Sequence, residues 1–190
     1  MRRARKDEAD GNESPANYMM RSVKDELADG LAGAIDNAGI DFLAYLPESR
    51  LGQIVPLLEQ RESIRMVQTA HENTAVSIAC GAAFAGLHPA VYMEGTGLYV
   101  STWSLQTIAS RSMLPMLLLA SYVGSMQDRM NNYTFAGFGP RIPSLLDTLG
   151  IGYRVLEDGM DLERKVVDAV RTMLAAKLPV ALLLTGEFTA

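Results

Sequence analysis

Glu72 is the residue of this sequence best suited to proton transfer. It follows the short apolar segment 64–67 and opens a segment of small residues, 72–85, that is predicted to be helical. An acidic residue in the first helical turn often only complements the helix dipole. The small side chains of this helix, however, indicate that another element or subunit packs very close to it, which would partly desolvate a carboxylate there. Desolvation raises a carboxyl pKa towards the range useful for proton transfer, so the residues alone leave both interpretations open.

Other candidate residues surround Glu72 or follow the next predicted strand. Gly95 and Gly97 flank Thr96. Glycine lets a backbone approach a ligand or a facing chain closely, although a plain turn explains the same residues. His71 is a candidate proton relay or substrate ligand, and a histidine at the surface or at an interface is an equally good explanation.

Three arginines and a serine are candidate substrate contacts. Ser49 and Arg50 follow the first predicted strand, and Arg129 and Arg141 lie in or beside a long polar segment. A guanidinium group pairs well with carboxylate, sulfonate or phosphonate oxygens, so either of the later arginines suits an anionic substrate. A helix cap explains Ser49 equally well.

These residues are positioned by alternating strand-like and helix-like segments, which predict one α/β domain over residues 17–190. Continuous apolar strands separated by helices indicate a three-layer α/β/α fold with a six-stranded parallel sheet, and ligands of such sheets bind at the carboxyl ends of the strands. The predicted strands are 41–46, 64–67, 90–93, 116–121, 153–156 and 180–184. The predicted helices are 23–37, 51–59, 72–85, 101–109, 142–149 and 162–174. Residues 1–16 lack apolar periodicity and are predicted to be a disordered tail.

Composition excludes several classes of protein. The 190 residues carry a net charge of −5, which argues against a nucleic-acid binder. One cysteine and two histidines make an intramolecular disulfide impossible and a metal site in this chain unexpected. The longest apolar run, 113–120, is far shorter than the roughly 20 residues that span a bilayer. No apolar stretch follows the basic start of the chain, so we expect a cytoplasmic protein without membrane contact.

Three segments, in order, resemble one enzyme family. The sequence His71-Glu72-Asn73-Thr74-Ala75, with a glycine closing the helix, resembles the pyrimidine-binding domain of thiamine-diphosphate enzymes. Leu46-Pro47-Glu48-Ser49 resembles the loop after the first strand in the sulfopyruvate and phosphonopyruvate decarboxylase branch. The segment 88–98, which contains Glu94-Gly95-Thr96-Gly97-Leu98, is similar to a third motif of that branch. The resemblance covers nearly the whole chain after residue 22.

The resemblance implies a fold, a cofactor and a reaction. It implies the thiamine-diphosphate-binding fold of the pyrimidine-binding domain, with Glu72 as the catalytic residue that holds the aminopyrimidine ring, while His71 stays a second catalytic candidate read from the residues alone. Gly95, Thr96 and Gly97 would contact the same cofactor. The reaction would be the decarboxylation of a small anionic 2-oxo acid, for which thiamine diphosphate is the electron sink.

The family's diphosphate site is missing from this sequence. Members hold the diphosphate through Mg²⁺ with a Gly-Asp-Gly motif, whereas this chain has only Asp158-Gly159 without the leading glycine. The resemblance therefore implies the alpha subunit of a two-chain enzyme. A beta subunit would carry the Gly-Asp-Gly motif, the diphosphate and Mg²⁺ in an α2β2 or larger assembly.

The substrate-side segments differ from the resembled branch, so the residues do not identify the 2-oxo acid. Three other functions remain open. The first is a carboligase subunit with the same cofactor, similar to acetolactate synthase. The second is a non-catalytic α/β interaction subunit, and the third is a flavodoxin-like nucleotide module.

Overall fold

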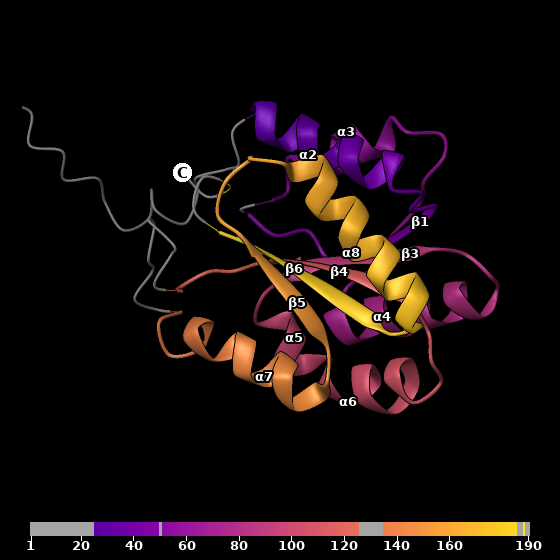
Figure 1. Cartoon of the computed structure of the whole chain (residues 1–190), viewed down its shortest axis with the longest axis vertical. Helices are drawn as coiled ribbons and strands as arrows, with labels where there is room; N and C mark the ends of the chain where they lie inside the picture. The colour runs from indigo at the N-terminus through magenta and orange to yellow at the C-terminus, as the bar shows by residue number, and fades with distance from the viewer. Residues whose placement is uncertain (1–24, 50, 126–134, 186–187, 189–190) are drawn as a thin grey trace, which may run out of the picture.

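The six strands in the described part of the chain form one parallel sheet. The computed structural model describes residues 25–49, 51–125, 135–185 and 188. Within these ranges the strands lie in the order β2-β1-β3-β4-β6-β5 (Figure 1). Every strand begins and ends within one residue of its predicted bounds, so the predicted sheet is confirmed. The strands are β1 (Phe42–Tyr45), β2 (Arg65–Gln68), β3 (Pro89–Glu94), β4 (Met116–Ser121), β5 (Gly152–Leu156) and β6 (Pro179–Leu184).

Helices cover both faces of the sheet, which confirms the three-layer architecture (Figure 1). One face packs against α2 (Asp25–Asn37), α3 (Ile54–Glu59) and α8 (Leu162–Ala176). The opposite face is covered by α4 (Glu72–Phe84), α5 (Gly97–Val100), α6 (Thr102–Ser104), the π-helical segment η1 (Leu105–Ser110) and α7 (Ile142–Leu149). The 3-10 turn η2 (Gly139–Arg141) leads directly into α7.

The alternation of side chains along the central strands explains why both faces need a cover. Tyr92, Leu119 and Leu182 pair in register across β3, β4 and β6 and belong to the core under α2 and α8. Their neighbours Val91, Leu118 and Ala181 also pair in register and belong to the core under α4 and α7. Strands that are apolar at every position are stable only when helices bury both sides of the sheet.

The single helix predicted for 101–109 is wrong in detail. The chain already turns into α5 at Gly97 and continues through α6 into η1, so three short helical segments replace one. The side-chain hydroxyl of Thr102 donates to the carbonyls of Leu98 and Tyr99, at 3.2 and 2.7 Å. Such side-chain bonds compete with the regular backbone ladder and interrupt the helix.

The predicted tail, residues 1–16, lies outside the described residues, and the domain bounds 17–190 remain a prediction. None of the helices in the described part of the chain is long and apolar enough to cross a membrane.

The segment after β4 folds back on itself through a close backbone contact. A Cβ atom at Gly139 would lie 2.7 Å from the carbonyl carbon of Gly124 and 2.9 Å from the amide nitrogen of Ser125. Both neighbours are backbone atoms and cannot rotate away. The turn that carries Arg141 is therefore held against the end of β4 only because residue 139 has no side chain.

We expect Gly139→Ala to lower the free energy of unfolding by about 1–3 kcal/mol, because the methyl group overpacks a rigid contact. Gly137→Ala is the matched control, since a Cβ there meets nothing within 4 Å, and its effect should stay within about 0.5 kcal/mol. Urea unfolding followed by circular dichroism measures both. Equal stability of the two variants would contradict the packing argument.

Candidate functional site

Glu72 begins α4 at the carboxyl edge of the sheet, as predicted. The chain leaves β2 through the buried Thr69, whose amide and hydroxyl both donate to the carbonyl of Tyr45, at 2.8 and 3.1 Å. His71 then adopts an extended backbone and caps the helix, and its Nδ1 accepts a hydrogen bond from the Asn73 amide at 3.2 Å. The described role of the exposed His71 is thus a helix cap, and its part in catalysis stays a prediction.

The side chain of Glu72 lies against Gly97. A Cβ atom at Gly97 would lie 2.5 Å from Cγ of Glu72 and 2.8 Å from Sδ of Met93. Gly95 is equally confined, since its Cβ would lie 2.6 Å from the Ser121 carbonyl oxygen. The two glycines are therefore required by close packing, and the structure brings Gly97 together with Glu72.

The Glu72 carboxylate is half-buried and has no hydrogen bond or ion pair with any described residue. A carboxylate that is partly removed from water and lacks a protein partner is available for a ligand's hydrogen-bond donor.

Two further carboxylates, which sequence reasoning did not single out, lie near Glu72. Burial raises the pKa of Glu94 above its ordinary value, and the charges of Glu48 and Glu72 raise it further. Thr96 opposes this shift, since its amide donates to Glu94 Oε1 at 3.3 Å and its hydroxyl to Oε2 at 2.8 Å. Glu48 accepts from the Leu51 amide and the Tyr92 hydroxyl, both at 2.5 Å. Glu94 is the last residue of β3 and Glu48 lies in the loop after β1, and these positions at the carboxyl ends of strands were the available signal.

Of the predicted substrate residues, the structure places Ser49 and Arg141. Ser49 is exposed in the loop after β1, while Arg50 and Arg129 lie outside the described residues. Arg141 lines a cleft of about 420 Å³ whose other lining residues are Thr96, Tyr99, Val100, Gly137 and Phe138. Arg141 and Thr96 therefore border the same open space.

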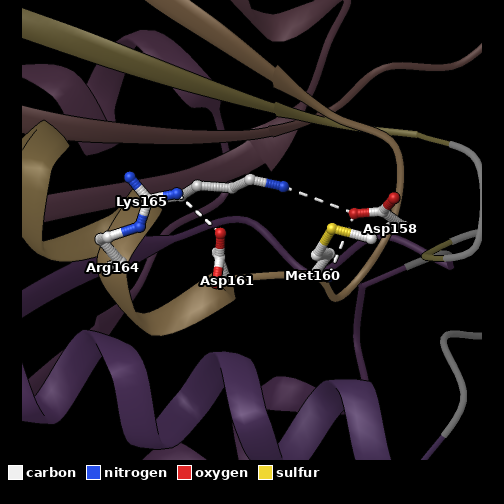
Figure 2. A network of polar contacts seen from close by, with 5 residues as sticks. All are labelled: Asp158, Met160, Asp161, Arg164 and Lys165. Atoms are coloured by element: carbon white, nitrogen blue, oxygen red, sulfur yellow. Dashed lines mark hydrogen bonds and ion pairs between the residues drawn. The ribbon is translucent and has the colours of Figure 1, made fainter.

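Asp158-Gly159, which lacks the leading glycine of a Gly-Asp-Gly motif, has a structural role. Asp158 Oδ1 accepts from the Met160 amide at 3.0 Å and from Lys165 Nζ at 3.4 Å (Figure 2). Beside it Asp161, whose pKa is lowered by a hydrogen bond from Arg164, precedes α8 in the left-handed conformation. These contacts fix the start of α8.

Two large aromatic side chains are exposed on α4 and α6. The two helices lie side by side, with Ser77 Oγ and Ser104 Oγ 3.5 Å apart. Trp103 and Phe84 are 75% and 66% exposed, and a Cβ at Gly81 would meet nothing within 4 Å. We call the surface of Gly81, Phe84 and Trp103 the α4–α6 face. Large exposed aromatic side chains are typical of a surface that binds a partner.

The small residues of α4 divide into two groups. Ala75, Ala79 and Cys80 are buried against the sheet, where burial raises the pKa of the Cys80 thiol to about 11. The strands thus account for the close packing on this side, whereas nothing in the described chain requires Gly81 to be small.

Comparison with known proteins yields a family match and several relatives. The family model described as "Thiamine pyrophosphate enzyme, N-terminal TPP binding domain" matches residues 25–135. Sulfopyruvate decarboxylase subunit alpha of Methanococcus maripaludis is 23% identical over 155 residues, which are 82% of this chain and 92% of that protein. Sulfopyruvate decarboxylase of Methanosarcina acetivorans is 27% identical over 134 residues, and the match spans only 34% of its length.

The fold also recurs among solved structures. The thiamine diphosphate-dependent 4-hydroxybenzoylformate decarboxylase of Rhodococcus jostii superposes with a TM-score of 0.65 and is 20% identical in sequence. The superposition covers 86% of this chain and 31% of that one. The 2-oxoglutarate:ferredoxin oxidoreductase of Magnetococcus marinus superposes with a TM-score of 0.67 at 18% identity, over 86% of this chain and 29% of that one. At this identity the likeness concerns the fold.

We expect the neutral variant Glu94→Gln to gain stability over the wild type as pH rises. A carboxyl whose folded pKa is raised binds its proton more tightly when folded, so its contribution is greatest at low pH. That contribution is lost between the ordinary pKa and the raised one. Urea unfolding of both proteins from about pH 4 to pH 8 measures the difference.

Thr96→Val serves as the second variant in this series. Removing the hydroxyl that favours the charged form of Glu94 raises its pKa further, so this variant should lose stability more steeply with rising pH than the wild type. If the difference in unfolding free energy between Glu94→Gln and the wild type does not change with pH, the raised pKa of Glu94 is contradicted.

Proposed function

Because the chain belongs to the family of thiamine pyrophosphate enzyme N-terminal TPP binding domains, we propose that it is the alpha subunit of a thiamine-diphosphate-dependent 2-oxo acid decarboxylase. It is homologous over most of its length to alpha subunits of sulfopyruvate decarboxylase. The observation that carries the proposal is the half-buried Glu72 carboxylate, which has no partner among the described residues and lies against Gly97.

The residues present fit the aminopyrimidine side of the cofactor. Glu72 supplies an acceptor for a ring donor or, when protonated, a donor to a ring nitrogen. Gly97 lets the turn pack directly against the Glu72 side chain, which keeps that side chain beside the turn. The Thr96 hydroxyl already donates to Glu94, so its part is to hold the turn in place. Thiamine diphosphate, when bound, supplies the electron sink for the loss of carbon dioxide.

The diphosphate and Mg²⁺ belong to a beta subunit in this proposal. Asp158 is already engaged by Met160 and Lys165, which supports a site on another chain. The relatives named subunit alpha imply a second subunit in those enzymes. The α4–α6 face offers the apolar surface that such a subunit would cover, in an α2β2 or larger assembly.

We expect Glu72→Gln in the assembled enzyme to lower the decarboxylation rate by about 10²-fold or more, because the group that controls the proton is lost. Glu62→Gln is the control, since Glu62 is exposed before β2, at the opposite edge of the sheet. Wild-type activity of Glu72→Gln would refute the catalytic role and favour a non-catalytic subunit. Product analysis with and without an added aldehyde separates decarboxylation from carboligation.

We expect Trp103→Ala to weaken assembly while leaving the isolated chain as stable as the wild type. Truncating an aromatic residue at the centre of an interface costs about 2 kcal/mol or more of binding. Met160→Ala is the control, because Met160 is 69% exposed and precedes α8, which covers the opposite face of the sheet. The measurement is the amount of a chain with a Gly-Asp-Gly motif that co-purifies with each variant. Full recovery with Trp103→Ala would exclude Trp103 from the interface.

A further inference from the structure

The cleft beside Arg141 combines one cation with apolar walls. Tyr99, Val100 and Phe138 supply its large apolar side chains, and Phe138 is 52% exposed. No carboxylate of the described residues forms an ion pair with Arg141. The rings of Tyr99 and Phe138 meet edge to face, with centroids 6.3 Å apart. A volume of about 420 Å³ lies within the range of small-molecule sites.

The backbone carbonyl of Phe138 fixes both sides of this cleft. It accepts the Tyr99 hydroxyl at 2.9 Å and the Arg141 amide at 3.0 Å. The α5 helix and the η2 turn are therefore tied to one oxygen atom. Burial raises the pKa of Tyr99, and the charge of Arg141, which lines the same cleft, opposes that shift.

The cleft adjoins the candidate cofactor residues. Ile142, the residue after Arg141, has its Cδ1 2.7 Å from where a Cβ of Gly95 would stand. Two residues further along the same turn, Gly97 packs on Glu72. Arg141 and Glu72 therefore flank one short turn, with Thr96 between them.

An anionic substrate needs a cation at this edge of the sheet. Glu48 and Glu72 both lie close enough to Glu94 for their charges to raise its pKa, in addition to the larger effect of burial. Like charges repel an incoming anion unless a positive group offsets them. A guanidinium suits this task, because it binds two oxygens of a carboxylate or sulfonate at once.

We propose that this cleft selects the substrate, with Arg141 pairing with an anionic group at the end remote from the 2-oxo acid. The body of the substrate then lies against the paired rings of Tyr99 and Phe138, so the cleft favours an apolar, preferably aromatic, arm over a single methylene. This assignment rests on the proposed function for the identity of the substrate, but binding of an anion on an apolar body is testable without it.

The first test is a titration of the full chain with phenylmethanesulfonate, followed by NMR shifts of the Tyr99 and Phe138 ring signals. Arg141→Gln should weaken binding about 10- to 100-fold, since a charge-assisted bond is lost, with Arg141→Lys in between. Arg65→Gln is the control, because this exposed arginine begins β2 at the opposite edge. Phe138→Ala should weaken phenylmethanesulfonate but leave methanesulfonate unchanged.

Wild-type affinity of Arg141→Gln for phenylmethanesulfonate would overturn the proposal, as would equal loss of both sulfonates in Phe138→Ala. The second test uses the assembled enzyme. Arg141→Gln should raise KM for 2-oxo acids that end in an anion, with kcat and the KM of neutral-tailed 2-oxo acids unchanged. An enzyme without decarboxylase activity would refute the proposed function, while the titration would still decide the cleft.

Discussion

The turn Gly95-Thr96-Gly97 passes between Glu72 and the end of β4 with no room for a side chain at either glycine. Because of this constraint, the carboxylate that opens α4 is held at a defined place on the sheet edge. The same turn seats Ile142, and with it the segment that carries Arg141. A shift of the turn would therefore move the candidate cofactor group and the candidate substrate group together. Close packing of side chains against the glycine backbone, more than any single hydrogen bond, is what relates these two groups.

Electrostatics explains why the turn needs Thr96 between the glycines. Glu94 ends β3 with its carboxyl group partly removed from water and near Glu48 and Glu72. Two hydrogen bonds from Thr96 offset part of the free-energy cost of ionising Glu94 in this environment. The same bonds fix the turn relative to the strand. The protonation of Glu94 is thus coupled, through Thr96, to the position of the turn that packs against Glu72. Charge and packing thus act on the same few residues.

The fold and the place of Glu72 were predictable from the sequence because they depend on local patterns. Strands that are apolar at every position define the sheet, and a helix that opens after a strand puts Glu72 at its carboxyl edge. The short helices after Gly97 were not predictable, since the side chain of Thr102 interrupts the backbone ladder. Glu94 was also missed, because its environment is made by residues from separate loops. Arg50 and Arg129 lie outside the described residues and remain predictions.

One segment links the two proposals. Val100 lines the cleft and is 49% exposed, and Trp103 of the α4–α6 face follows three residues later, about one helical turn away. A subunit that covers Trp103 would therefore stand at the open side of the cleft and remove water from it. Excluding water strengthens the attraction between a guanidinium and an anion, because the local dielectric constant falls. Substrate selection and assembly are then not independent. The isolated chain should hold an anionic ligand more weakly than the complete enzyme, by an amount that depends on how far the partner closes the cleft.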